Sequence, residues 1–234
     1  MTDLDNSHPK QQRLNKFVAL SLGVSRRQAD ELIEQGSISV NNQPAVLGKR
    51  LTVADTVTYH GKDISPQKYR LILLHKPVGY LCSRASQGGV PTIYGLLPPE
   101  LANLKPVGRL DKDTSGLILL TNDGDFAHQM THPSFKKTKR YQATLDKPLE
   151  PLHRQMISDF GVDLPDGRSQ LTLERQHEGD DTRWAIQMSE GRNRQIRRTF
   201  SALGYTVTKL HRTNFGNYSL GDIKRGEWQE VDIS

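Results

Sequence analysis

The chain is organised around residues 106–120, which read PVGRLDKDTSGLILL. The first part of this stretch is rich in Gly and charged residues, as in a loop, and the last part is an uninterrupted apolar run typical of a buried strand. Within the loop, Asp111 lies between the apolar Leu110 and the basic Lys112. A carboxylate at the rim of an apolar pocket, with cations nearby, has the surroundings of a nucleophile. Most such acids only form turns, so the residues alone leave both interpretations open.

A second stretch, residues 138–145, reads TKRYQATL. Its alternation predicts a strand that places Tyr141 on the face opposite Arg140. A tyrosine in a half-buried strand usually belongs to the core, and the pattern alone assigns Tyr141 no other role.

A third stretch, residues 190–204, reads EGRNRQIRRTFSALG. Ile196, Phe200 and Leu203 form the apolar stripe of a helix, and Gly204 is its expected end. Four arginines crowd the start of this helix, where the helix dipole disfavours cations: Arg192, Arg194, Arg197 and Arg198. The arrangement predicts a bound anion there, either a phosphate or a carboxylate, and a solvated basic face is the alternative.

The beginning of the chain has a different pattern. Two short helices are expected there, the first ended by Gly23 and the second begun by a capping box of Ser25 and Gln28, and strands follow. A polar segment with Gly and Pro then separates this part from the rest. We therefore divide the chain into a disordered tail (1–12), a small domain (13–60), a linker (61–68) and a large domain (69–234).

The composition limits the class of protein. The chain has 234 residues, 35% of them hydrophobic, and a formal net charge of +6, which fits a polyanionic partner without requiring one. It has no long apolar run and no secretory signal pattern, so we expect a cytoplasmic protein without a membrane span.

Cysteine and histidine usage argues against a metal site. A single cysteine, Cys82, excludes an internal disulfide and a Cys-based metal cluster. His128 and His132 lie four residues apart, but Gln129 replaces the Glu of a zinc-protease motif and Pro133 breaks the helix. We expect no metal and no cofactor.

Residues 108–117, GRLDKDTSGL, closely resemble the catalytic loop of the pseudouridine synthases, and more narrowly that of the RsuA-like family, which modifies ribosomal RNA. Residues 139–141 and 190–198 resemble the second and third motifs of that family, in the expected order. The resemblance implies an α+β catalytic domain with a mixed, mainly antiparallel sheet flanked by helices. His75, where the family usually has Asn, is a minor departure.

The same resemblance implies roles for three residues. Asp111 would be the nucleophile, Tyr141 would stack on the uracil and could remove a proton late in the reaction, and Arg197 would pair with Asp111. An adjacent cation favours the ionised form of a carboxylate. Arg109, before the nucleophile, would fill the space left by a flipped-out base, with a phosphate contact or a structural salt bridge as alternatives.

Residues 13–60 resemble the alpha-L RNA-binding domain found in a ribosomal small-subunit protein and in some tRNA synthetases, although Asn15 stands where that family usually has Asp. We therefore expect a monomer whose partner is ribosomal RNA. The residues expected to contact it are Arg13, Lys16, Arg26, Arg27, Arg109, Lys139, Arg192, Arg194 and Arg198.

The resulting prediction is an enzyme that isomerises uridine to pseudouridine in ribosomal RNA. The sequence of residues 190–194, EGRNR, slightly favours the large-subunit RNA as the substrate. A non-catalytic ribosome-assembly factor or RNA chaperone is the alternative from another class, and a synthase acting on tRNA fits the motifs less well. Binding alone would not require Asp111, Tyr141 and Arg197 together.

Overall fold

The computed structural model describes residues 11–233, which fold into two compact units divided between Tyr69 and Arg70. Of the expected tail, residues 1–10 lie outside the described residues. Gln12, however, belongs to strand β1 (Gln12–Arg13) and pairs with Leu51 of β4 (Arg50–Leu51). The prediction that the tail extends to residue 12 was therefore wrong.

The first unit begins with two helices, α1 (Leu14–Leu22) and α2 (Arg26–Glu34), after the short strand β1. Gly23 adopts a left-handed conformation, φ 69°, which ends α1 as the sequence predicted. Ser25 accepts a hydrogen bond from the Gln28 backbone and Gln28 returns one to Ser25, so the predicted capping box is confirmed.

A small sheet packs against these helices, with the strand order β3-β2-β5-β6. Its strands are β2 (Ile38–Val40), β3 (Gln43–Pro44), β5 (Val57–Tyr59) and β6 (Lys62–Asp63). His60 and Gly61 both have positive φ and turn the chain back, so that Lys62 pairs with Tyr59. The predicted linker thus starts inside the sheet, and its first residues were assigned wrongly.

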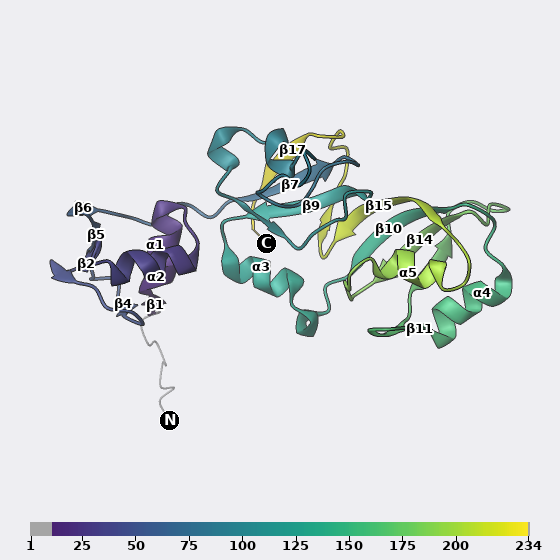
Figure 1. Cartoon of the computed structure of the whole chain (residues 1–234), viewed down its shortest axis with the longest axis horizontal. Coiled ribbons are helices and arrows are strands. Elements are labelled where there is room, and N and C mark those ends of the chain that lie inside the picture. Colours follow the sequence, from purple (N-terminus) through teal and green to yellow (C-terminus); the bar gives the residue numbers. More distant parts are fainter. Residues whose placement is uncertain (1–10, 234) are drawn as a thin grey trace, which may run out of the picture. The chain divides into compact units, whose positions relative to one another are not determined.

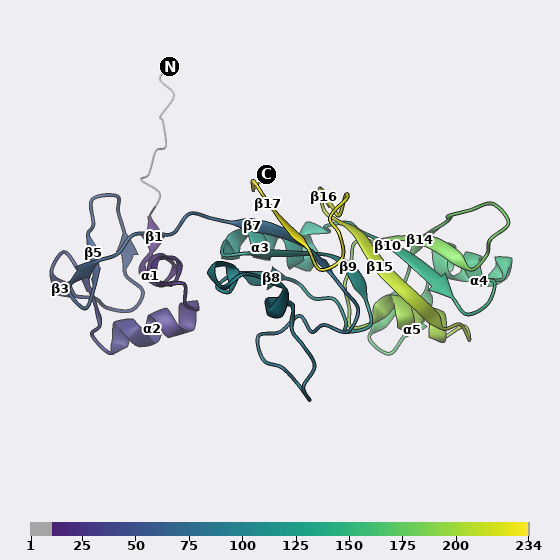
Figure 2. The ribbon, with the colours of Figure 1, turned by 90° about the horizontal axis from the view of Figure 1, so that it is seen from above.

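The second unit is built on one mixed sheet of nine strands, shown in Figures 1 and 2. Seven strands follow the order β13 (Thr172–Arg175), β14 (Arg183–Met188), β10 (Lys139–Leu145), β15 (Val207–Phe215), β9 (Ser115–Thr121), β7 (Leu71–Lys76) and β17 (Trp228–Val231). β8 (Lys105–Val107) also pairs with β9, and β16 (Tyr218–Ser219) with β15. Only the β15–β9 pair in this sheet is parallel, so the predicted mixed, mainly antiparallel sheet is confirmed.

Helices cover both faces of this sheet. Their bounds are α3 (Gly124–Thr131), α4 (Pro151–Gln155), which continues as a π-turn (Met156–Phe160), and α5 (Gln195–Ser201). Short 3-10 turns cover Ile93–Leu96, Pro99–Leu101 and Pro133–Phe135, and the hairpin of β11 (Val162–Leu164) and β12 (Gly167–Ser169) lies outside the sheet.

The two faces have separate cores. Ile72 and Leu74 of β7 share a core with Phe200 of α5, while Leu71 of the same strand packs in the other core with Phe126 of α3. This follows from the alternation of side chains along a strand that is buried on both faces. Each fully buried Ile or Leu contributes about 1.5–3 kcal/mol.

Gly116 allows β9 to approach β15 closely. Its φ is +111°, and a Cβ at this position would overlap the backbone of Arg212. Because β9 directly follows the loop that carries Asp111, this close approach fixes the end of the loop against β15. Among residues 11–233, no helix has the length and apolar character needed to cross a membrane.

Candidate active site

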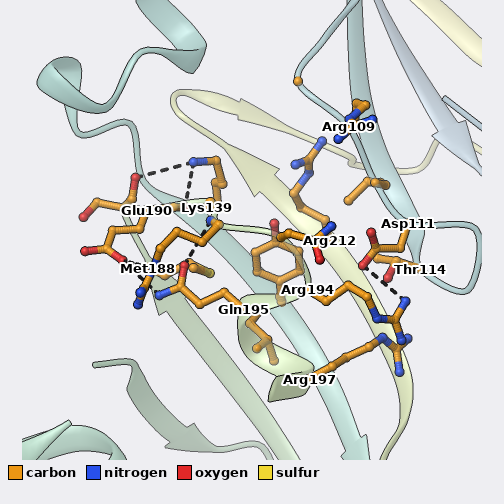
Figure 3. A pocket seen from close by; sticks show the side chains of 18 of the residues that line it. Arg109, Asp111, Thr114, Lys139, Met188, Glu190, Arg194, Gln195, Arg197 and Arg212 are labelled. Atoms are coloured by element: carbon orange, nitrogen blue, oxygen red, sulfur yellow. Dashed lines mark hydrogen bonds and ion pairs between the residues drawn. The ribbon is translucent and has the colours of Figure 1, made fainter. Parts of the chain in front are cut away.

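A cavity of about 1000 Å³ opens where the loop of residues 108–114 meets β10, β15 and the start of α5 (Figure 3). Asp111, Tyr141 and Arg197 all line it, although they come from three distant parts of the chain. The three motifs identified in the sequence are therefore brought together at one place.

The side chain of Lys76 holds the backbone of this loop in place. Its side chain is fully buried, and its Nζ donates hydrogen bonds to the backbone carbonyls of Pro77 (3.0 Å), Asp111 (3.1 Å) and Thr114 (2.7 Å). Burial lowers the pKa of Lys76, and the nearby carboxylates of Asp113 and Asp111 oppose that effect. The sequence analysis missed this residue, because a Lys-Pro pair after a strand resembles an ordinary turn.

Three further contacts hold the same loop. The backbone N–H of Gly79 donates to the carbonyl of Lys112 at 2.8 Å, and Nη2 of Arg197 donates to the carbonyl of Asp113 at 2.9 Å. The Leu110 N–H lies 3.4 Å from the buried Cys82 sulfur. The loop backbone is thus fixed from several elements, as a site for precise chemistry requires.

Asp111 does not pair with the arginine that the resemblance implied. Its Oδ2 lies 3.7 Å from Nη1 of Arg194, whereas Arg197 forms its ion pair with Asp113, at 3.4 Å between Nε and Oδ2. The reason is local geometry. Arg194 has a left-handed backbone, φ 45°, just before α5 and reaches over the loop, while Arg197 lies deeper and also donates to the carbonyl of Val207.

Asp113 is the centre of this charged cluster. Arg194 donates to both of its carboxylate oxygens, at 3.0 Å each. Burial opposes ionisation of Asp113, but the hydrogen bonds from Arg194 and the charges of Arg197 and Arg194 outweigh it and hold its pKa below the ordinary value. Burial in turn lowers the pKa of Arg197.

Tyr141 lies on β10 and is 8% exposed. Its cross-strand neighbours are Ile186 on β14 and Arg212 on β15. Tyr141 is therefore largely buried, as expected of a core residue, and it also lines the cavity.

Lys139 lines the same cavity two residues earlier along β10. Its Nζ donates to the carbonyls of Glu190 at 2.9 Å and Ser189 at 3.4 Å. Burial, with a smaller contribution from the charge of Arg212, lowers the pKa of Lys139 to about 8, although Glu190 acts in the opposite direction.

Arg212 is a second buried cation at the cavity, 2% exposed. Its Nε donates to the carbonyl of Leu117 at 2.8 Å, its guanidinium lies 4.9 Å from the Phe215 ring centre, and its Nη2 has no hydrogen-bond partner in the structure. The sequence carries no signal for it, since an arginine in an alternating strand is usually exposed.

Comparison with known families identifies this arrangement. The sequence profile of the RNA pseudouridylate synthase family matches residues 70–202, which include the loop, β10 and α5. The chain belongs to the RNA pseudouridine synthases. The S4 domain profile matches residues 12–57, the first unit, so the resemblance of that unit to a ribosomal-protein-type RNA-binding domain is confirmed as well.

Individual relatives agree with this assignment over nearly the whole chain. The dual-specificity RNA pseudouridine synthase RluF of Salmonella typhi is 36% identical, covering 94% of this chain and 75% of the relative. The ribosomal small subunit pseudouridine synthase A of Pasteurella multocida is 35% identical, covering 94% of this chain and 95% of the relative. The ribosomal large subunit pseudouridine synthase B of Bacillus subtilis is 33% identical, covering 94% of this chain and 92% of the relative.

A solved structure also matches this synthase in sequence and fold. It is a crystal structure of a pseudouridylate synthase with 32% identity and a TM-score of 0.67, covering 94% of this chain and 96% of the other.

Four of the synthase's predicted RNA contacts are hydrogen-bonded to protein groups: Lys139 and Arg194, as described above, and Arg192 and Arg198. Arg198 donates to both carboxylate oxygens of Asp166, at 2.9 and 2.7 Å, and Arg192 reaches the same residue at 3.1 Å and the carbonyls of Gly167 and Arg168 at 2.8 Å. The anions predicted near the start of α5 are thus carboxylates. For all four residues, an RNA contact stays a prediction.

The other predicted RNA contacts lie on accessible surfaces. Arg109 is exposed at the cavity edge (Figure 3). In the S4 unit, Arg13, Arg26 and Arg27 are exposed and Lys16 is half-buried. Within residues 11–233, no group of three or more His, Cys, Asp or Glu side chains is placed to share a metal ion.

Proposed function

We propose that this synthase converts uridine to pseudouridine in ribosomal RNA, and of the two subunits we favour the large-subunit RNA. The observation that supports the proposal most is the meeting of Asp111, Tyr141 and Arg197 at one cavity. The three relatives named above act, by their names, on RNA of the small subunit, of the large subunit, or with dual specificity. The preference for the large subunit rests on the sequence of residues 190–194, EGRNR.

The reaction needs no redox partner and no group donor. The bond from ribose C1′ to uracil N1 breaks, the base turns, and C1′ joins C5. The C5 proton leaves to solvent and N1 gains a proton, so atoms and charges balance. Asp111 would begin this sequence by attacking C1′ or by removing a ribose proton, and both routes are part of the proposal.

Arg194 and Arg197 would divide the role that the resemblance gave to Arg197 alone. Arg194 is the guanidinium within 4 Å of Asp111 and would orient its carboxylate. Arg197 would hold the loop through Asp113, to which it is joined at both the backbone and the side chain. Tyr141 would offer its ring as a stacking surface for the uracil.

A paired uridine would have to leave its helix to reach Asp111, at a cost of roughly a few kcal/mol in lost stacking and pairing. The 1000 Å³ cavity is large enough to receive a nucleoside. Arg109, exposed at the edge, would fill the vacated space. If so, Arg109→Ala lowers activity on a hairpin RNA and leaves activity on an unpaired RNA of the same sequence unchanged.

The S4 unit would supply much of the affinity. Arg13, Lys16, Arg26 and Arg27 give it a cationic surface whose binding to phosphates should weaken as salt is added. This synthase would act as a monomer in the cytoplasm, where its substrate RNA would be assembled.

The test offers this synthase RNA labelled with tritium at uracil C5, as separate large-subunit and small-subunit fragments. Tritium release on the large-subunit fragment, and not on the small-subunit fragment, is the expected result. Release only on the small-subunit fragment would overturn the choice of subunit. Tight binding without release on both fragments, naked or within a partly assembled particle, would favour the non-catalytic assembly factor.

A further inference from the structure

A second pocket lies beside the active-site cavity. Its volume is about 410 Å³, and its lining residues are Lys136, Lys137, Thr138, Arg140, Gln187, Asn214, Gly216 and Asn217. Lys136 lines both pockets, so they adjoin. Nothing in the proposed reaction uses this second pocket.

The lining has the character of an anion site. Three of its side chains are cations, Lys136, Lys137 and Arg140, and none of its lining residues is acidic. Among the side chains that line this pocket, Arg140 Nε donates a hydrogen bond to Gln187 Oε1 at 3.2 Å, which leaves the other guanidinium nitrogens of Arg140 for a ligand. The remaining groups are amides and a hydroxyl, the usual partners of phosphate and ribose oxygens.

The backbone around this pocket is held in place. Lys136 has a left-handed conformation, φ 44°, which is uncommon for a residue with a Cβ and is often found at functional sites. Gly216 donates its N–H to the carbonyl of Thr138 at 2.8 Å. A Cβ at Gly216, which directly follows β15, would lie 2.9 Å from the Met130 side chain of α3 and 4.0 Å from the Lys137 side chain, so glycine allows the chain to pass close to both.

We propose that this pocket binds the phosphodiester backbone of the RNA strand next to the nucleotide that enters the active site. The inference rests on the proposed function for its substrate, RNA, but not on the reaction itself. Because the pockets share Lys136, a strand with one nucleotide in the larger pocket can continue past the smaller one. Its cations would fix the position of the strand without reading the bases.

The test compares two variants of the pocket with two controls from elsewhere on the same unit. Lys137→Ala and Arg140→Ala remove pocket cations, whereas Lys209→Ala and Arg154→Ala remove exposed cations that line neither pocket. The full chain is titrated with a fluorescent 12-nucleotide oligouridylate and with a large-subunit rRNA fragment at several KCl concentrations. Melting temperatures confirm that each variant is folded.

We expect each pocket variant to weaken RNA binding roughly fivefold at moderate salt, and the slope of log K against log salt to fall by about 0.7–1 for each cation removed. On RNA that is turned over, KM rises and kcat stays unchanged. Asn217→Asp, which places a negative charge in the pocket, should weaken binding as well. It covers the case in which Arg140→Ala fails to fold.

Equal affinities and salt slopes in the pocket variants and the controls would overturn the proposal, and so would a fall in kcat with unchanged affinity. The binding readout needs no turnover. If the wild type binds RNA without forming pseudouridine, the proposed function fails while the pocket is still tested. If pseudouridine forms and the pocket variants bind like the controls, the pocket proposal alone fails.

Discussion

Arg194 donates two hydrogen bonds of 3.0 Å to the carboxylate of Asp113. The same guanidinium lies 3.7 Å from Asp111, so one arginine touches both acids of the loop. Arg197 supports Asp113 from the other side. We infer that Asp113 positions the arginines and that Asp111 remains available for the chemistry.

Replacing Asp113 by Asn should therefore damage catalysis more than binding. The amide keeps the shape of the side chain but removes the charge that fixes Arg194, a change worth roughly 1–3 kcal/mol, or about 5- to 150-fold in kcat. Single-turnover kinetics, with the enzyme in excess over the RNA and above the Kd, should show this loss in the rate of the bound complex, with an unchanged Kd. A Kd that rises as much as kcat falls would instead place Asp113 in RNA binding.

The lowered pKa of Asp113 also predicts a pH effect on stability. Its folded form binds a proton less readily than the unfolded chain, so its stabilisation is present above the ordinary carboxyl pKa near 4 and is lost as the pH falls through the lower folded value. Urea denaturation of wild type and Asp113→Asn should give a difference that shrinks below pH 4. A difference that grows below pH 4 would contradict this assignment.

Lys76 should be essential for the folded loop. In Lys76→Met, three backbone carbonyls lose their buried donor, and we expect the free energy of unfolding to fall by about 3 kcal/mol. Lys112→Met, an exposed lysine in the same loop, is the matched control and should change stability by at most about 0.5 kcal/mol. Equal denaturation midpoints for the two variants would show that Lys76 does not hold the loop.

Lys139 predicts a pH dependence of RNA binding. Because its folded pKa is about 8, it carries its charge at pH 7 and loses most of it by pH 9. RNA affinity of the wild type should therefore decline as the pH rises through 8. Lys139→Arg keeps the charge over this range and should show a flat profile. The measurement is Kd between pH 6.5 and 9, and parallel profiles for both proteins would rule out Lys139 as the titrating group.

Local features were predictable from the sequence because their causes are local. Gly23 and the capping box of Ser25 and Gln28 fixed the helices of the S4 unit, and the apolar run after Ser115 became a strand that is buried on both faces. The three motifs of the catalytic unit indicated which residues meet.

The partners of the charged groups were not predictable, because they depend on long-range packing. Arg197 pairs with Asp113 and not with Asp111, since the left-handed backbone of Arg194 carries that side chain across the loop. Lys76 and Arg212 became important only when β7, β9 and β15 assembled around the loop. No spacing in the sequence encodes these contacts.

The most direct test of the central claim, that Asp111 drives uridine isomerisation, compares the wild type with Asp111→Asn. Both proteins are given the C5-tritiated ribosomal RNA fragment on which the wild type is active, and tritium release and RNA affinity are measured together. We predict release by the wild type, no release above background by Asp111→Asn, and dissociation constants that agree within about twofold, since the amide removes only the nucleophilic charge. Continued release by Asp111→Asn at a comparable rate would contradict the account.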